Sequence, residues 1–255
     1  MKNSHPFSNF FYSLSGSLVI MEKDARIYYI KPPVIIFGIL FPLFFFLAFA
    51  LGRKVSSFIL IPGMVSMSLF FTSSSVGPLI TPWERTARTY ERLLTTPISL
   101  FSLILGDAMA GFIFGILISL IPLFLGFTFF NVKVVHPFCL IGNMLLSSLC
   151  FSSLGVALSS SATEAPSQAM MLSSLVRFPL IFISGIFIPL NNLPNWGKII
   201  ATISPLTYTT DLLRFSLYDD GFYPIFLDLL MLVIFSILFF GLALKLHKKN
   251  LIKAI

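Results

Sequence analysis

The sequence predicts an all-α polytopic membrane protein, and two observations support that prediction. Of the 255 residues, 56% are hydrophobic, only 11% are charged, and 30 are phenylalanine. A soluble domain carries about 25% charged residues, so this chain could not cover a water-facing surface. The apolar residues are also grouped in runs of about 20, the length that crosses the hydrocarbon core of a bilayer.

Six such runs predict six transmembrane helices. They are Pro33–Leu51, Ser57–Ile80, Leu100–Gly126, Pro137–Leu158, Ala169–Pro189 and Pro224–Leu244. An even number of spans places both termini on the same side of the membrane. We therefore interpret residues 1–255 as a single transmembrane domain with three parts: an N-terminal interfacial segment (1–32), a six-span bundle (33–244) and a basic tail (245–255).

The cationic residues predict how this bundle is oriented. Lys and Arg concentrate in cytoplasmic loops, so the side that holds more of them is predicted to be inside. With both termini inside, the inner segments hold 11 of the 17 cations and the outer segments hold five, Arg177 being the one within a span. We therefore expect a multi-pass protein of the cytoplasmic (plasma) membrane with cytoplasmic termini. No nucleic-acid motif accompanies the net charge of +7, so nucleic acid is not an expected partner.

An amphipathic helix is predicted before the first span. Apolar side chains recur there at helical spacing, opposite a face of serines. The apolar stripe consists of Phe7, Phe10, Phe11, Leu14, Leu18 and Met21. The run is too short and too rich in hydroxyl groups to cross a bilayer, and it lacks the small-residue cleavage site of a signal peptide. We expect this helix to lie in the inner membrane interface.

The segment Trp83–Pro97 is densely charged and lies between two apolar runs. Its charged side chains are Glu84, Arg85, Arg88, Glu91 and Arg92. Trp83 begins an apolar face at helical spacing, and Glu84 precedes Arg88 by four residues, the favourable order for an intrahelical pair. Pro97 ends the element. The pattern predicts a two-faced cytoplasmic helix, and a solvated interfacial loop is the alternative for a charged segment taken alone.

The segment between the fifth and sixth spans is moderately apolar and rich in proline. Pro189, Pro194 and Pro205 divide it into short helices, because proline interrupts helical hydrogen bonding. Its aromatic residues, among them Trp196 and Tyr208, suit the depth of the lipid headgroups. These features predict half-buried helices that fold back into the outer leaflet, in preference to an ordinary extracellular loop.

The sequence offers no constellation of catalytic groups. The three histidines lie outside the spans and far apart, which supports neither a metal site nor a histidine-based relay. A phosphate-cradling loop of the G-x-x-x-x-G-K-[ST] type does not occur. We therefore expect no enzymatic activity, no metal and no cofactor, and any ATP that drives transport would be hydrolysed by another polypeptide.

Three ionisable residues fall within predicted spans: Asp107, Arg177 and Asp228. Charge within a bilayer is costly and indicates a functional role. From the helical rise, Asp107 lies about 12 Å and Arg177 about 13 Å into their spans. Similar depths predict an ion pair between them, as a structural clamp in preference to a proton relay. Asp228 lies near the outer end of its helix, where we expect it to snorkel.

Small residues in the fourth span recur at a spacing that favours close helix packing. Ser148 precedes Ser152 by four residues, and Gly155 precedes Ser159 by four. This small-xxx-small pattern lets neighbouring helices approach closely. A polar lining for a substrate path is the alternative interpretation, and the sequence does not separate the two.

Together these segments resemble the membrane subunit of type-2 ATP-binding-cassette (ABC) exporters, a group that includes daunorubicin-resistance-like permeases. Glu91–Pro97, ERLLTTP, is similar to the family's E-x-L-L-x-T-P signature. The outer segment resembles the family's extracellular re-entrant segment at Gly185, Pro189, Pro194, Trp196, Pro205, Tyr208, Asp211 and Arg214. Arg88 stands where the family often has glycine and Ser204 where it often has asparagine, which leaves subfamily and substrate open.

The resemblance implies an exporter subunit that works with a separate ATPase. In the family, the N-terminal helix and the charged cytoplasmic helix dock onto that ATPase. The implied ATPase-coupling residues are Trp83, Glu84, Arg85, Arg88, Glu91 and Arg92. Two permeases, as a homodimer or heterodimer, and two ATPases would form the exporter among membrane lipids.

Two functions remain open at this point. The first is ATP-driven export of a hydrophobic, lipid-linked or drug-like substrate, with which the phenylalanine-rich bundle is compatible. The alternative is a membrane-embedded assembly or accessory subunit of a secretion or gliding-type complex, without transport of a small solute.

Overall fold

The structure, a computed structural model, describes residues 6–28, 32, 36–44, 47, 56–89, 92–93, 98–160 and 166–254. In this part of the chain the regular elements are all helical. They are α1 (Pro6–Tyr28), η1 (Ile36–Leu40), α4 (Ser57–Thr86), α6 (Leu100–Phe130), α7 (Pro137–Ser159), α8 (Pro166–Ile183), η2 (Leu190–Asn192), α9 (Asn195–Ala201), α10 (Pro205–Tyr218) and α11 (Ile225–Ala254).

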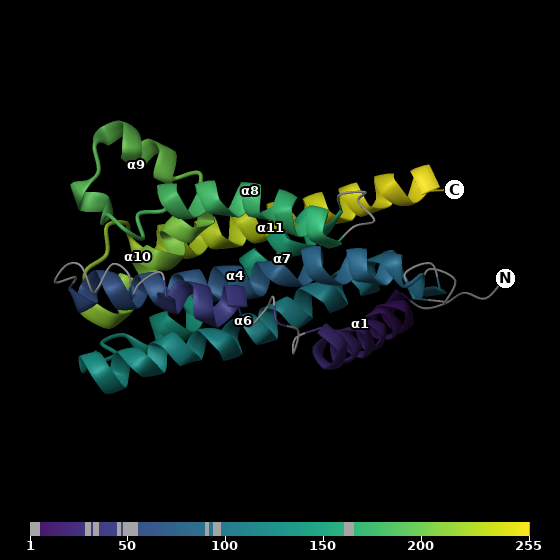
Figure 1. Cartoon of the computed structure of the whole chain (residues 1–255), viewed down its shortest axis with the longest axis horizontal. Helices are drawn as coiled ribbons and strands as arrows, with labels where there is room; N and C mark the ends of the chain where they lie inside the picture. Colours follow the sequence, from purple (N-terminus) through teal and green to yellow (C-terminus); the bar gives the residue numbers. More distant parts are fainter. Residues whose placement is uncertain are drawn as a thin grey trace.

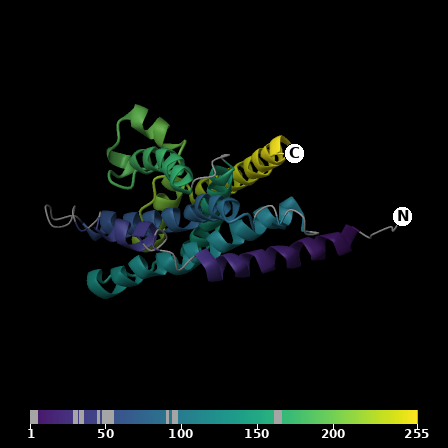
Figure 2. The same cartoon turned by 45° about the vertical axis from the view of Figure 1, so that its right-hand side comes forward.

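The long helices run side by side along the longest axis of the molecule (Figure 1). The short helix α9 and helix α10 lie at one end of this bundle, while α1 and the C-terminal end of α11 lie at the other (Figure 1). Two views show α1 on the outside of the bundle next to α6 (Figures 1 and 2). The molecule therefore has two distinct ends. The proline-rich segment after α8 lies at one end, and the predicted amphipathic helix lies at the other.

Four helices in the described ranges are long and apolar enough to cross a membrane: α4, α6, α7 and α11 up to Lys249. They confirm an all-α polytopic membrane protein. The fifth predicted span corresponds to α8, whose apolar part, Ser167–Ile183, is shorter than a usual span. Of the first predicted span, Pro33–Leu51, only residues 36–44 and 47 are described, so the count of six remains a prediction. Helix α11 continues without a break past residue 245, where the basic tail was predicted to begin.

Helix α4 is the centre of the bundle. It packs against α6, α7, α8 and α10, and almost all of it is buried. Several of its hydroxyl groups are satisfied within the protein: Ser74 and Ser75 each donate to the carbonyl oxygen four residues earlier, and Ser73 Oγ lies 3.0 Å from Ser148 Oγ of α7. Helix α11 is mostly exposed, as expected for a helix that faces lipid.

Close contacts between α4 and α7 depend on glycine. A Cβ atom added at Gly155 of α7 would lie 2.5 Å from the Ser74 carbonyl oxygen, and one at Gly77 of α4 would lie 2.4 Å from the Gly155 carbonyl oxygen. Both distances are too short for real atoms, so only glycine permits this approach. The prediction that small residues in the fourth span serve helix packing is confirmed at Gly155.

Replacement of Gly155 by alanine is expected to lower the free energy of unfolding by about 1–3 kcal/mol, because the added methyl group overlaps the α4 backbone. Thermal unfolding of the purified protein in detergent measures this loss. Gly142→Ala is the matched control on the same helix, since a Cβ there meets no atom within 4 Å. Equal unfolding temperatures for the two variants would contradict the packing account.

Candidate functional site

The charged segment after the second span begins as the last turn of α4. Helix α4 continues through Trp83 to Thr86, and Arg88 then has a φ of +54°. A residue in this left-handed conformation cannot continue an α-helix, so the prediction of one helix over Trp83–Pro97 is wrong. Glu91 and residues 94–97 lie outside the described residues.

Glu84 points into the protein. It is 3% exposed, and its carboxylate forms an ion pair with Lys23 Nζ of α1. The predicted intrahelical pair with Arg88 is therefore wrong: Arg88, past the end of the helix, is exposed, whereas Glu84 turns inward to α1. Trp83, next to Glu84, is 46% exposed. The end of α4 thus presents one inward carboxylate and an outward aromatic and cationic surface.

Helix α1 turns a partly polar face toward the bundle. Ser17, Ile20 and Asp24 are buried, whereas Leu18, a member of the predicted apolar stripe, is 45% exposed. The contact with α6 is close, because a Cβ added at Gly106 would lie 2.6 Å from Ile20 Cβ. The helix itself is confirmed, and it turns Ser17, from the predicted serine face, toward the bundle while Leu18 of the apolar stripe points away from it. In a membrane, polar side chains of such a helix pack against the protein, whereas apolar side chains can contact lipid. The side chains of residues 6–14 lie outside the described set.

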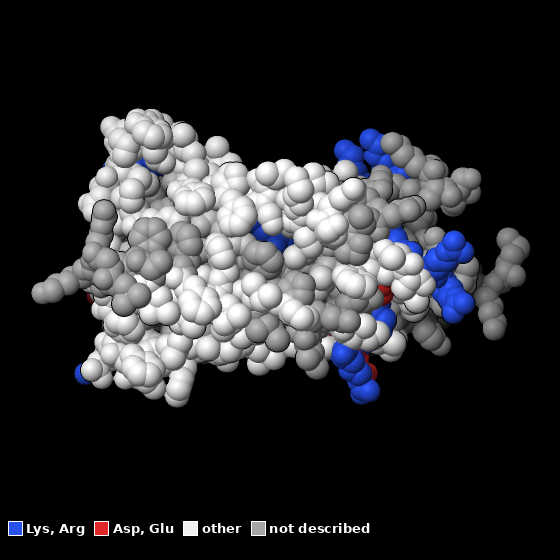
Figure 3. Space-filling model, viewed as in Figure 1, with Lys and Arg blue, Asp and Glu red and all other residues white. Residues whose placement is uncertain are grey.

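Four ionisable side chains gather where α1, α4 and α6 meet. Lys23 Nζ lies 3.0 Å from Asp24 Oδ1 and pairs with Glu84, while Asp24 faces Asp107 of α6. We call these four residues the α1 clamp. Burial raises the pKa of the Asp24 carboxyl group, and the neighbouring Lys23 charge opposes that rise. Figure 3 shows that Lys and Arg, with some acidic side chains, gather at this end, while the middle of the visible face is largely uncharged.

The predicted ion pair between Asp107 and Arg177 is wrong. Arg177 donates to the Ser74 carbonyl oxygen and, at 3.2 Å, to Ser75 Oγ. Asp107 belongs to the α1 clamp instead. Helix α4 packs against both α6 and α8 and holds the partners of Arg177. Equal depth in the membrane thus did not bring the two side chains together, because they face different neighbours.

Asp228, in the first turn of α11, is also buried. It is 2% exposed and faces Asp211 of α10. The expectation that it snorkels to the interface is therefore wrong.

The segment after α8 folds as short helices separated by prolines, as predicted. Pro189 precedes η2, Pro194 precedes α9, and Pro205 is the first residue of α10. Gly185 adopts a φ of +75°, which suits glycine. Trp196 on α9 is 68% exposed, while Tyr208 on α10 is buried and donates from its hydroxyl to the Thr202 carbonyl oxygen. Tyr208 therefore packs within the protein.

Two charged residues of α10 bind the backbone of the loop before η2 and of the loop after α10. The Asp211 carboxylate accepts the backbone N–H groups of Phe222 and Tyr223 at 2.8–2.9 Å. Arg214 Nη2 donates to the Gly185 carbonyl oxygen at 2.8 Å. These contacts fix the loop before η2 and the loop after α10 to one buried helix, so the outer segment is a packed part of the fold.

Two members of the α1 clamp, Lys23 and Asp24, were not predicted from the sequence. They follow the amphipathic stripe directly. Their place in the last turns of the same helix was the available signal.

Comparisons with known proteins agree on one family. Residues 18–218 match the family model described as ABC-2 type transporter. Nodulation protein J of Bradyrhizobium diazoefficiens is 27% identical over 223 residues, covering 84% of this chain and 83% of that protein. The protein ycf38 of Cyanophora paradoxa, whose name describes a transport permease, is 29% identical over 249 residues, covering 86% and 84%. YbhR of Escherichia coli, whose name describes a multidrug ABC transporter permease, is 23% identical over 167 residues, covering 60% and 42%.

The contacts predict that Lys23 and Glu84 are energetically coupled. In a double-mutant cycle, Lys23→Gln and Glu84→Gln should show a coupling of about 0.5–3 kcal/mol in the free energy of unfolding, as expected for side chains in contact. The matched control is the cycle of Asp107→Asn with Arg177→Gln, whose effects should add because the two side chains have different partners. Additivity in the first cycle, or strong coupling in the second, would contradict these contacts.

The raised pKa of Asp24 predicts that α1 docks more weakly as the pH rises. The docked helix holds a proton that the undocked helix releases at lower pH, so docking is strongest below the ordinary carboxyl pKa and weakens through the raised pKa. Amide hydrogen exchange of α1, corrected for the intrinsic effect of pH, measures this. Asp24→Asn should reduce the pH dependence, and Glu22→Gln on the exposed face should not. Identical profiles for all three proteins would refute the prediction.

Proposed function

The chain belongs to the ABC-2 type transporter family, and on that premise we propose that it is the transmembrane subunit of an ATP-driven exporter in the cytoplasmic membrane. The names of two of its relatives, ycf38 and YbhR, support a permease role. The sequence lacks the phosphate-cradling motif of an ATPase, so we assign ATP hydrolysis to a separate subunit.

In this proposal the end that holds the α1 clamp is cytoplasmic. The excess of Lys and Arg in the predicted inner segments supports this orientation. Helix α1, the end of α4 and the last turns of α11 share that end of the molecule (Figure 1). The α9–α10 segment then faces outward, as a re-entrant segment in the outer leaflet.

The observation that supports this function best is the α1 clamp. Lys23 joins α1 to Glu84 at the end of α4, and Asp24 on the same helix faces Asp107 of α6. An ATPase that pushes on the surface next to Glu84 would therefore move α4 and α1 together through the ion pair of Glu84 with Lys23, and α6 with them through its close packing on α1 at Gly106. This is a direct route by which the ATP cycle of another subunit could rearrange the bundle.

The set of residues proposed to contact the ATPase is now smaller by one, Glu84. Trp83, Arg85, Arg88, Glu91 and Arg92 remain the proposed docking residues. Glu84 does not contact the ATPase in this proposal, since its carboxylate is buried and pairs with Lys23 of α1. The docking surface would thus be cationic and aromatic, with a buried carboxylate behind it that fixes α1.

The proposed assembly contains two permease subunits, as a homodimer or heterodimer, and two ATPase subunits. We propose a hydrophobic, lipid-linked or drug-like cargo. The exposed phenylalanines of the bundle are compatible with such a cargo, and the multidrug name of YbhR supports a drug-like one.

Reversal of charge at the docking surface should release the ATPase. With Arg85→Glu and Arg92→Glu together, we expect the complex to dissociate because the cationic surface is lost. The measurement is co-purification with the ATPase subunit, identified by its G-x-x-x-x-G-K-[ST] motif. The matched control, Lys133→Glu with Lys198→Glu, makes the same change of charge in the predicted outer segments and should retain the ATPase. Retention by both variants would contradict the docking assignment.

A further inference from the structure

One exposed stripe of α11 changes along its length from apolar to cationic. Its members recur at three- and four-residue spacing, so they share one face of the helix. The apolar members, all exposed, are Leu230, Ile234, Ile237, Leu238 and Leu242. The stripe then continues through Lys245, Lys248 and Lys249, which are also exposed and which we call the lysine face. A surface suited to hydrocarbon thus ends directly in three ammonium groups.

A buried histidine fixes the rotation of this part of α11. His247 Nε2 lies 3.1 Å from the Val156 carbonyl oxygen and 3.2 Å from Ser159 Oγ, both on α7. A step of two residues turns a helix by about 200°. Lys245 and Lys249, two residues on either side of His247, therefore point away from α7. The packing of α11 on α7 holds the lysine face toward the surroundings of the bundle.

The depth of the lysine face matches the edge of a bilayer. Lys245 lies 20 residues after Ile225, the first residue of α11, which corresponds to about 30 Å along the helix. The hydrocarbon core of a bilayer is about 30 Å thick. If Ile225 lies at one boundary of the core, the lysine face lies at the opposite boundary, among the headgroups. The apolar stretch from Ile234 to Leu242 then lies beside the acyl chains of that leaflet.

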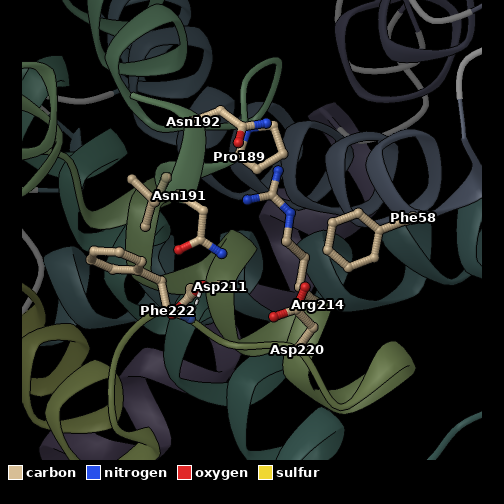
Figure 4. A pocket seen from close by; sticks show the side chains of 9 residues that line it. Phe58, Pro189, Asn191, Asn192, Asp211, Arg214, Asp220 and Phe222 are labelled. Carbon is tan, nitrogen blue, oxygen red and sulfur yellow. Dashed lines mark hydrogen bonds between the residues drawn. The ribbon is translucent and has the colours of Figure 1, made fainter. Parts of the chain in front are cut away.

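The charge of this end of α11 is of one sign. The helix has no acidic residue after Asp228. The opposite end of the molecule differs, since Figure 4 shows the carboxyl groups of Asp211 and Asp220 near the guanidinium of Arg214. Figure 3 shows Lys and Arg gathered at the end where α11 finishes in Figure 1. Clustered lysines directly beyond a transmembrane helix attract anionic lipid headgroups.

We propose that this face of α11 binds an anionic phospholipid in the leaflet at the α1 clamp end. Its acyl chains lie on the apolar stretch, and its phosphate contacts the lysine face. The continuous stripe favours a lipid over an acidic protein surface, because a lipid is apolar and anionic in the same order along the membrane normal. The site goes beyond the proposed export function, since lipid binding requires neither an ATPase nor a cargo, so the two proposals can fail independently.

Quenching of tryptophan fluorescence by brominated lipids tests this site on the full-length chain alone. Trp83→Phe and Trp196→Phe remove the two native tryptophans, both of which are exposed. A single tryptophan is then placed by Leu242→Trp, next to the lysine face, or by Leu230→Trp, on the same stripe in the other half of the membrane. Vesicles contain equal amounts of phosphatidylglycerol and phosphatidylcholine, with one of the two brominated at a time.

The local preference for phosphatidylglycerol over phosphatidylcholine should be about fivefold greater at the Leu242 site than at the Leu230 site, since even one lysine near the headgroups contributes a factor of this size. Lys245→Gln with Lys249→Gln should lower the preference at the Leu242 site to that at the Leu230 site. Lys245→Arg with Lys249→Arg, which retains the charge, should preserve it. The matched control, Lys133→Gln with Lys198→Gln, removes the same charge from other elements and should also preserve it.

Equal preference at the two tryptophan sites would overturn the proposal. So would an unchanged preference in the glutamine pair at Lys245 and Lys249, or an equal loss in the control pair. If the glutamine pair at Lys245 and Lys249 keeps the lipid preference but no longer co-purifies with the ATPase subunit, the lysine face binds protein and the lipid assignment is wrong.

Discussion

The ion pair between Lys23 and Glu84 links the N-terminal helix to the central helix of the bundle, and the proposed coupling depends on it. A buried ion pair adds little net stability, because the desolvation of its charges offsets their attraction. Loss of Lys23 is nevertheless costly, since the buried Glu84 carboxylate is left without its partner, whereas Lys23 is itself partly exposed. The pair therefore acts chiefly as a positional constraint: it fixes where α1 meets α4, while the close packing of Ile20 on Gly106 places α1 on α6.

Helix α4 connects the two ends of the molecule. Its 30 residues span about 45 Å, from Phe58 near the outer segment proposed above to Glu84 in the α1 clamp. Between these ends the helix is held closely by Gly155 of α7 and by the buried guanidinium of Arg177. A close-packed protein interior has low compressibility, so movement of one packed helix is passed on to its neighbours. A force on α4 at Glu84 would therefore displace the opposite end of the same helix at Phe58. Helix α4 thus gives the proposed exporter a physical path between its two faces.

The sequence predicted those features that depend on composition and local chemistry. Four long apolar helices and the proline-separated outer segment follow from hydropathy and from proline geometry. Features that depend on rotation about a helix axis were missed. The depths of Asp107 and Arg177 were alike, but depth does not say which neighbour a side chain faces. Similarly, the periodicity of α1 could not show which of its faces packs against α6, and no sequence signal at Arg88 predicted the left-handed conformation that follows α4.

The central claim is that α1, the end of α4 and α6 move as one body during the ATP cycle. Spin labels at Val19 on α1 and Phe101 on α6, both exposed, would report the distance between these helices in the complete complex. Pulsed electron paramagnetic resonance without nucleotide, with ATP and with trapped ADP should give one narrow distribution that does not change. The same labels in a Glu84→Gln background should give a broader distribution. A shift with nucleotide in the otherwise unmodified protein would contradict the account.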